Sequence, residues 1–442
     1  MRCIHLEQST IALIIIGIAM VLYVTETFPI ATTSFLVVLA LAAFQIIPMG
    51  TAFAGFGSDT TFLIVGMVIV GAALFETGVA NVMGENIMKL MARVGTNERI
   101  FMLILAPITA SISLVLSNTA TTGIMLPIAG STAAASGGKL LKKNVFMMIG
   151  FIAVAGGGLT IVGSTPQQIA QQYLQAGGYE LIGFWELSRT GVPILLLSVI
   201  FFQTIGMKLQ RKVFNFPEVE DDNLSPPAVK DGRKVQYVER NSTKMVINIA
   251  ILVFCVAGFI TSQHDFAFWS LGGIAMMGAV ACVATGCISQ KRVFEKMDWT
   301  TVVIMGCSIG ISAGIRESGA GELIAGTVLN ILGDRMTPWL LVAALALVTM
   351  VLTNFMSSTA TTALMVPIAA TLARTLGYDV KSLVMLIAIA GNLGFATPVS
   401  TPPIAMTLSG GYRFKDYVIV GGIFNFLAYL LLIVIFPFVF PL

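Results

Sequence analysis

Two stretches of the chain carry almost the same run of polar residues in strongly apolar surroundings. LVLSNTATTGIMLPIA occupies positions 114–129 and NFMSSTATTALMVPIA occupies positions 354–369. The side chains of Ser, Asn and Thr are neutral hydrogen-bonding groups, which are costly to place in an apolar environment unless they find partners. Such groups can hold an anion and still release it, whereas a buried arginine would bind too firmly. The two copies therefore predict a paired binding site.

A second pair of motifs follows the first. GGGLTIVGSTPQQ (156–168) and LGFATPVSTPPI (393–404) each place Ser-Thr-Pro inside an otherwise apolar segment. Proline lacks a backbone donor and interrupts a helix, so Pro166 and Pro402 predict breaks in two helices. A helix broken at mid-membrane exposes N–H groups at a positive end, which attracts anions, and carbonyls at a negative end, which can coordinate Na⁺.

The four motifs together predict two half-sites that face each other. The tips are Ser117, Asn118 and Thr119 in one copy and Ser357, Ser358 and Thr359 in the other, and the breaks are at Ser164–Thr165 and Ser400–Thr401. This arrangement suits an anion with two charged ends, each held by one half-site. The alternative is a structural role, because Ser and Thr in membrane helices often bond the i−4 carbonyl or join helices. Duplication of both motifs in the same order favours the binding site.

The composition is that of a membrane protein. Hydrophobic residues make up 56% of the 442 residues and charged residues 11%, whereas a soluble domain is about half apolar and a quarter charged. The apolar residues form many stretches of roughly 17–25 residues, which are long enough to span a bilayer as helices. We therefore expect an all-α polytopic membrane protein. The net charge of +3 is too small to indicate nucleic-acid binding.

The apolar stretches fall into two halves with the same order of elements. The first half, 1–212, is expected to hold scaffold helices at about 9–98, a hairpin at 99–137, a broken helix at 144–175 and a helix at 190–208. The second, 244–442, is expected to hold scaffold helices at about 244–336, a hairpin at 337–374, a broken helix at 380–410 and a helix at 417–438. The hairpins are predicted to be re-entrant, since irregular backbone at membrane depth must line a cavity or be buried in protein.

Topology follows from the crossing number and the charges. Five spans and one re-entrant hairpin per half give an odd number of crossings, so the second half is expected to be an inverted repeat of the first. The positive-inside tendency places Lys89, Arg93, the lysines of 139–143, the polar linker 213–243 and segment 289–298 in the cytoplasm. Segment 49–59, which has no Lys or Arg, and both termini are then expected outside.

The duplicated motifs resemble those of the divalent anion:sodium symporter family, within the ion transporter superfamily, which carries di- and tricarboxylates and sulfate. SNTATT at 117–122, SSTATT at 357–362 and the two Ser-Thr-Pro breaks carry the resemblance, which covers nearly the whole chain. It implies a homodimeric secondary transporter in the inner (plasma) membrane. It also implies Na⁺ as the coupling ion without another cofactor, and an elevator mechanism in which a transport domain slides against a scaffold.

The resemblance also assigns roles to individual residues. Substrate contacts would come from Ser117, Asn118, Thr119, Ser357, Ser358, Thr359, Thr165, Thr401 and Pro402. One sodium site would use Ser113, Ser117, Asn118 and Ser164, and a second would use Thr353, the carbonyl of Met356, Ser358 and Ser400. The sequence departs from the family at Ser358, where an asparagine is usual. It departs again where the usual Thr-Pro-Pro-Asn becomes 165-TPQQ-168 and 401-TPPI-404. The resemblance therefore does not decide whether the chain has the second sodium site.

These observations favour a Na⁺-coupled carrier of C4-dicarboxylates such as succinate, malate or fumarate. A Na⁺-independent dicarboxylate exchanger and a carrier of sulfate or another oxyanion are the alternatives of the same fold, and a channel or an arsenite-type efflux protein is a more distant one. An enzyme is not expected, because the five cysteines form no CxxC pair and the two histidines, His5 and His264, lie near segment ends.

Three carboxylates lie near apolar segments and are candidates for a role in proton coupling. Glu26, Glu76 and Glu317 are close to the ends of predicted spans, and Glu76 and Glu317 occupy equivalent places in the two halves. A carboxylate inside a membrane is a functional candidate by default. Their place at span ends favours interfacial or scaffold contacts instead.

Overall fold

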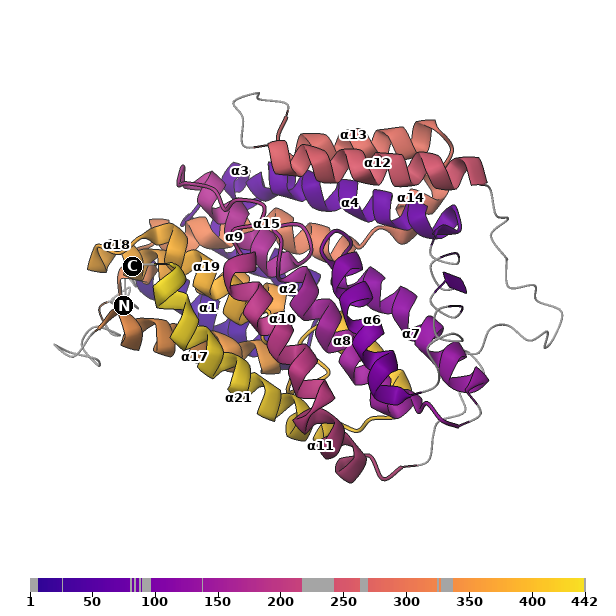
Figure 1. Cartoon of the computed structure of the whole chain (residues 1–442). Coiled ribbons are helices and arrows are strands. Elements are labelled where there is room, and N and C mark those ends of the chain that lie inside the picture. Colours follow the sequence, from indigo (N-terminus) through magenta and orange to yellow (C-terminus); the bar gives the residue numbers. More distant parts are fainter. Residues whose placement is uncertain are drawn as a thin grey trace.

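The computed structural model describes residues 7–25, 27–79, 82, 85–86, 89, 97–136, 138–216, 242–262, 269–323, 326 and 337–440. Over these residues the regular structure is entirely helical, as the composition predicted. Most of the linker 213–243, Glu26 and both histidines lie outside the described residues. Figure 1 shows α4, α12 and α13 as one group of roughly parallel helices and α10, α17 and α21 in another part of the molecule.

Five described helices are long and apolar enough to cross a membrane. They are α4 (Asp59–Glu76), α12 (Ser242–Thr261), α15 (Trp299–Glu317), α17 (Pro338–Phe355) and α21 (Phe414–Val439). α10 (Ser188–Gln203) and α11 (Ile205–Val213) form a sixth candidate that bends by 49°. Shorter apolar helices are α1 (Gln8–Thr25), α2 (Ile30–Ala43), α13 (Leu271–Ala284) and α19 (Val380–Gly391). The chain is therefore a multi-pass membrane protein by length and composition of its helices.

The polar motifs lie where helices turn or break. α6 (Glu98–Ser113) and α7 (Asn118–Ala135) meet at the first tip, and α17 and α18 (Ser358–Leu376) meet at the second. A non-helical segment separates α8 (Lys142–Gly157) from α9 (Thr165–Ala176), and another separates α19 from α20 (Pro402–Met406), which continues as η3 (Thr407–Gly410). Pro166 and Pro402 lie in the first turns of α9 and α20. Proline is tolerated there because the first N–H groups of a helix have no partner inside the helix.

Elements from the two halves of the chain pack against each other. α4 packs along α13, and α2 packs along α15, which also contacts α3 (Met49–Ala52) and η1 (Ala54–Gly57). α9 packs against α18, and α7 packs against α20. Small residues bring the backbones close, because a Cβ on Gly66 would lie 2.5 Å from the backbone of Ala275. Each hairpin therefore contacts the broken helix of the other half.

Polar contacts bring together segments that the charge pattern assigned to one side. Lys143 Nζ donates to the carbonyl of Phe216 at 2.7 Å, which joins the basic segment before α8 to the start of the linker. Arg292, in α14 (Gln290–Lys296), pairs with Glu76 at 3.6 Å. Glu317 is half-exposed and pairs with Arg316 at 3.7 Å. Glu76 and Glu317 are thus in ion pairs at helix ends, and which side faces the cytoplasm stays a prediction.

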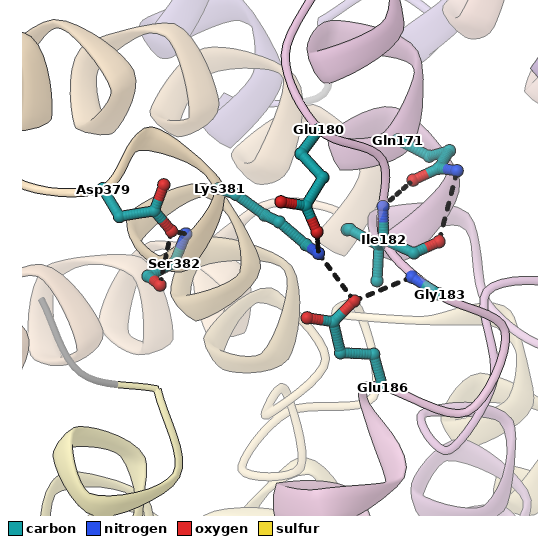
Figure 2. Close-up of polar contacts among 8 residues, drawn as sticks. All are labelled: Gln171, Glu180, Ile182, Gly183, Glu186, Asp379, Lys381 and Ser382. Carbon is teal, nitrogen blue, oxygen red and sulfur yellow. Dashed lines mark hydrogen bonds and ion pairs between the residues drawn. The ribbon is translucent and has the colours of Figure 1, made fainter.

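A partly buried ion pair fixes the connection between α9 and α10 to the start of α19. Lys381 Nζ lies 2.6 Å from Glu180 and 2.9 Å from Glu186, and Glu186 also accepts from the N–H of Gly183 at 2.8 Å (Figure 2). The side chains of Lys381 and Glu186 are 11% and 19% exposed, whereas Glu180 is 81% exposed. Lys381 and Glu186 therefore form the stabilising pair, and Glu180 adds an exposed contact of little weight.

Glu186→Gln is expected to lower the thermal stability of the purified protein, because it leaves the partly buried Lys381 without its better partner. We expect a loss of about 1–3 kcal/mol in the free energy of unfolding, below the 3–5 kcal/mol of fully buried pairs. Thermal unfolding in detergent measures it. Glu180→Gln is the matched control and should change stability by less than about 0.5 kcal/mol. Equal effects of the two variants would contradict this assignment.

Candidate functional site

The first tip is held by its own side chains and by the break that follows it. Ser117 caps α7, since its Oγ accepts from the N–H of Ala120 at 3.2 Å. Ser113 Oγ donates to the carbonyl of Ala153 in α8 at 2.7 Å. Thr160, in the break between α8 and α9, donates from its Oγ1 to the carbonyl of Leu114 at 2.6 Å. The tip is thereby fixed to both sides of the α8–α9 break.

The side-chain amide of Asn118 lies in a cluster of oxygen atoms. One of its terminal atoms is 2.8 Å from Ser113 Oγ and 3.0 Å from the carbonyl oxygens of both Ala153 and Gly163. With the nitrogen in this position, the amide donates to these oxygens; with the oxygen there, four oxygen atoms converge. Four converging oxygens suit a hard cation, and carbonyls at a helix break are typical sodium ligands.

Two glycines make room for this amide. A Cβ on Gly157, the last residue of α8, would lie 1.8 Å from the Asn118 amide, and a Cβ on Gly163 would lie 2.5 Å from the carbonyl of Gly157. Any side chain at Gly157 would therefore displace Asn118. The glycine run 156–158 thus allows a side chain to approach a helix end.

The second tip repeats this frame with one change. Ser357 caps α18 by accepting from the N–H of Ala360 at 3.1 Å. Thr353 Oγ1 lies 2.9 Å from Ser358 Oγ and donates to the carbonyl of Gly391 at 2.8 Å. The N–H of Ser358 donates to the carbonyl of Ser400 at 3.0 Å. Met356 follows directly after α17, in extended conformation, and is fully buried.

The correspondence between the tips extends to the breaks. Thr397 Oγ1 donates to the carbonyl of Asn354, as Thr160 does to the carbonyl of Leu114 in the first half. Thr353 and Ser358 occupy the places of Ser113 and Asn118. The two tips differ in side-chain length at this position: the Ser358 side chain is shorter than that of Asn118, and its Oγ comes only to within 3.3 Å of the Ser400 carbonyl oxygen. The second tip thus has the same frame without the amide in the oxygen cluster.

The two breaks are joined directly to each other. Ser164 Oγ donates to Asn392 Oδ1 at 2.6 Å. The sequence assigned Ser164 to a sodium site but did not indicate Asn392. The only feature that could have indicated Asn392 is an asparagine directly after the apolar helix α19. Asn392 and Gln167 also line a small cavity of about 20 Å³, room for about one water molecule. Among the described residues, both polar side-chain atoms of Gln167 and the amide nitrogen of Asn392 are buried without a hydrogen-bond partner.

The predicted substrate residues divide by exposure. Ser117, Thr119 and Pro402 are exposed, and Thr165, Ser357 and Thr359 are half-buried. Asn118, Ser358 and Thr401 are buried, at 9%, 4% and 8% exposure. The exposed and half-buried side chains can meet a ligand directly, whereas Asn118 and Ser358 make contacts within the tips, and Thr401 Oγ1 is buried without a hydrogen-bond partner. None of these side chains titrates near neutral pH, so attraction for an anion would come from the N-termini of α7, α9 and α18.

Gly157→Ala is expected to abolish transport by displacing the Asn118 amide. The added methyl group would occupy the position of that amide, and overpacking of this kind costs about 1–3 kcal/mol. Uptake by reconstituted protein and its sodium dependence measure the effect. Gly422→Ala in α21 is the control, because nothing lies within 4 Å of its added Cβ. Normal uptake by Gly157→Ala would contradict the placement of the amide.

The comparison with known protein families now identifies the class. The model of the citrate transporter (CitMHS) family matches residues 20–383. The chain belongs to this family, and it is a secondary transporter rather than an enzyme. This confirms the resemblance to carriers of the divalent anion:sodium symporter type that the motifs indicated.

Individual relatives cover most of the chain. A transporter of Haemophilus influenzae is 28% identical over 429 residues, which is 95% of this chain and 89% of the relative. The sodium-dependent dicarboxylate transporter SdcS of Staphylococcus saprophyticus is 26% identical, over 95% of this chain and 84% of the relative. The sodium-dependent high-affinity dicarboxylate transporter 3 of Caenorhabditis elegans is 25% identical, over 92% of this chain and 78% of the relative.

Solved transporters share the fold at low sequence identity. The YdaH transporter of Alcanivorax borkumensis matches with a TM-score of 0.60 and 15% identity, over 88% of this chain and 86% of that chain. MtrF of Neisseria gonorrhoeae matches with a TM-score of 0.55 and 12% identity, over 98% of this chain and 95% of that chain. At these identities the likeness concerns the fold alone.

Proposed function

We propose that this chain is a Na⁺-coupled transporter of C4-dicarboxylates such as succinate, malate and fumarate. The observation that carries the proposal is the pair of matching tips, each capped by a serine and fixed to a helix break. The names of relatives in S. saprophyticus and C. elegans, both sodium-dependent dicarboxylate transporters, support the substrate and the ion. A Na⁺-independent exchanger and an oxyanion carrier remain the alternatives that the experiment below separates.

The substrate would bind with one carboxylate at each tip. Ser117 and Thr119 would donate to one carboxylate and Ser357 and Thr359 to the other, together with N–H groups at the starts of α7 and α18. Thr165, Thr401 and Pro402 would close the site from the breaks. Two anionic charges in a site built from neutral donors need compensation, because burying an unpaired charge is very unfavourable. Bound Na⁺ supplies that compensation, which is a physical reason for coupling.

The first sodium site would use the oxygen cluster around Asn118. One terminal atom of the Asn118 amide already lies within 3.0 Å of Ser113 Oγ and of the carbonyl oxygens of Ala153 and Gly163. Ser117 and Ser164, the other residues assigned to this site, adjoin the cluster in sequence. Sodium binding would require the amide oxygen to face the ion, and its NH₂ group would then turn toward the substrate. One side chain would thus respond to both ligands.

The second sodium site would be the weaker of the two. Thr353, Ser358 and Ser400 come together, but their hydroxyl groups already contact each other or nearby carbonyls. The Met356 carbonyl would be the fourth ligand. Ser358 offers one hydroxyl oxygen where an asparagine would offer a longer-reaching amide oxygen. We therefore expect one strong sodium site and one weak site.

The transport cycle would follow the elevator scheme in a homodimer. The two inverted repeats, 1–212 and 244–442, would be joined by the cytoplasmic linker 213–243 in the plasma membrane. The packing of α4 on α13 and of α2 on α15 supports a scaffold. The packing of each hairpin on the broken helix of the other half supports a separate transport domain that moves as one body.

Radiolabelled succinate uptake into proteoliposomes tests the proposed function. We expect uptake driven by an inward Na⁺ gradient without internal succinate, and inhibition by unlabelled fumarate and malate. Asn118→Ala should lower uptake at least about tenfold, since a hydrogen bond to a charged group contributes about 1.5–3 kcal/mol. Uptake that needs internal dicarboxylate and ignores Na⁺ would instead identify an exchanger, and uptake of sulfate without succinate would identify an oxyanion carrier.

The same assay tests the substrate residues. The double variant Thr119→Ala with Thr359→Ala should abolish uptake while the protein stays folded. Thr375→Ala, whose hydroxyl donates to a carbonyl of its own helix α18, is the matched control and should transport normally. Normal uptake by the double variant would show that the threonines of the tips do not bind the substrate.

Ser358→Asn is expected to strengthen sodium coupling by restoring an amide at the second tip. The coupling ratio, measured as labelled Na⁺ and succinate entering together, should rise by about one Na⁺ per substrate, as a completed ligand set predicts. Ser358→Ala serves as the control and should lower the apparent affinity for Na⁺. An unchanged ratio and affinity in both variants would show that this tip does not bind sodium.

A further inference from the structure

A second pocket lies outside the tips and breaks, between α9 and α15. About 70 Å³ of it can be reached by groups the size of water, which is room for several such groups, and the pocket is open to the surface. Ile169 and Tyr173 line it from α9, Ser308, Ser312 and Arg316 line it from α15, and Thr51 lines it from α3. The four-residue spacings show that one face of each helix borders the pocket. Nothing in the proposed transport site uses these side chains.

The polar groups of this pocket are hydrogen-bond donors. Arg316 contributes a guanidinium group, and Tyr173, Ser312 and Thr51 contribute hydroxyl groups, while no Asp or Glu lines the pocket. Glu317 lies 3.7 Å from Arg316, which is longer than the 2.7–2.9 Å of a strong charge-assisted hydrogen bond. The guanidinium group of Arg316 therefore keeps donors available for an anion in the pocket.

The pocket is closed at one end and open at the other. Ser308 Oγ donates to Gln172 Oε1, and Gln172 Nε2 donates to Ser58 Oγ at 2.6 Å, so α9, α15 and the cap of α4 are joined there. Ile169 and Ser308 are 2% and 3% exposed, whereas Arg316 is 43% exposed at its side chain. Arg316 thus lies at the open end. α9, which borders the pocket, begins at Thr165 of the proposed substrate site.

We propose that this pocket is a second anion site, which binds a carboxylate of the transported dicarboxylate through Arg316 before the substrate reaches the tips. The proposal rests on the proposed function for the identity of the anion. Arginine is suited to this task, because its planar fork of donors matches the two oxygens of a carboxylate. The charge pattern places Thr51 on the outer side, so the site would capture substrate from outside the cell.

Succinate uptake as a function of concentration tests this site in the full-length protein. Arg316→Gln should raise KM about tenfold, as loss of one charged hydrogen bond predicts, and should leave the maximal rate unchanged. Arg211→Gln is the matched control: Arg211 is also an exposed arginine that pairs with a glutamate, Glu98, at 3.2 Å, but it does not line the pocket. Its KM should equal that of the wild type. Arg316→Lys should restore part of the affinity, because it keeps the charge without the fork.

Each other outcome has a distinct meaning. An unchanged KM for Arg316→Gln, or a fall in maximal rate alone, would overturn the anion site and leave the proposed function intact. A rise in KM that occurs in phosphatidylglycerol vesicles and vanishes in phosphatidylcholine vesicles would assign Arg316 to a lipid phosphate and overturn substrate capture. No succinate uptake by the wild type would overturn the proposed function itself, and with it the ligand named for this pocket.

Discussion

The site depends on the need to pair backbone polar groups wherever a helix turns or breaks inside the membrane. A bilayer offers no water for those groups, so each must find a partner within the protein. Here the tips and the breaks satisfy one another: Thr160 donates to the carbonyl of Leu114, Thr397 to that of Asn354, and Ser358 to that of Ser400. Neither a tip nor a break would be stable alone, so the fold brings both together and creates a polar region among apolar helices.

The same network limits which residues can serve a ligand. Some hydroxyl groups of the tips and breaks donate their hydrogen bonds to backbone carbonyls, as those of Thr160, Thr353 and Ser400 do. Ser117 and Thr119 lie on the exposed side of the first tip. A hydroxyl that donates to a backbone carbonyl has no proton left to donate to a substrate, whereas Ser117 and Ser357 only accept from the backbone and keep theirs. Ligand binding is therefore expected from the exposed side of each tip, with ions in the cluster just beneath it.

Much of this arrangement could be predicted from the sequence, because polar runs and prolines inside apolar segments are local signals. The tips at Ser117 and Ser357 and the helix starts at Pro166 and Pro402 belong to this group. Asn392 could not be predicted, because its bond to Ser164 joins segments far apart in the chain. The end of α19 at Gly391, nine residues before the expected break at Ser400–Thr401, could not be predicted either, since apolar residues continue past it.

A comparison of the two tips distinguishes the side chains that are needed to close a tip from those that are available to bind a ligand. The second tip folds with Ser358 bonded to Thr353 and to the backbone of Ser400, so an amide is not required to close a tip. Asn118 nevertheless extends to the carbonyls of Ala153 and Gly163, into a space that exists only because residue 157 is glycine. Closing the tip does not require that reach, in which the amide either donates to the carbonyl oxygens or, turned over, adds a fourth oxygen to them. On the proposed function, the first half-site would therefore be the stronger of the two sodium sites.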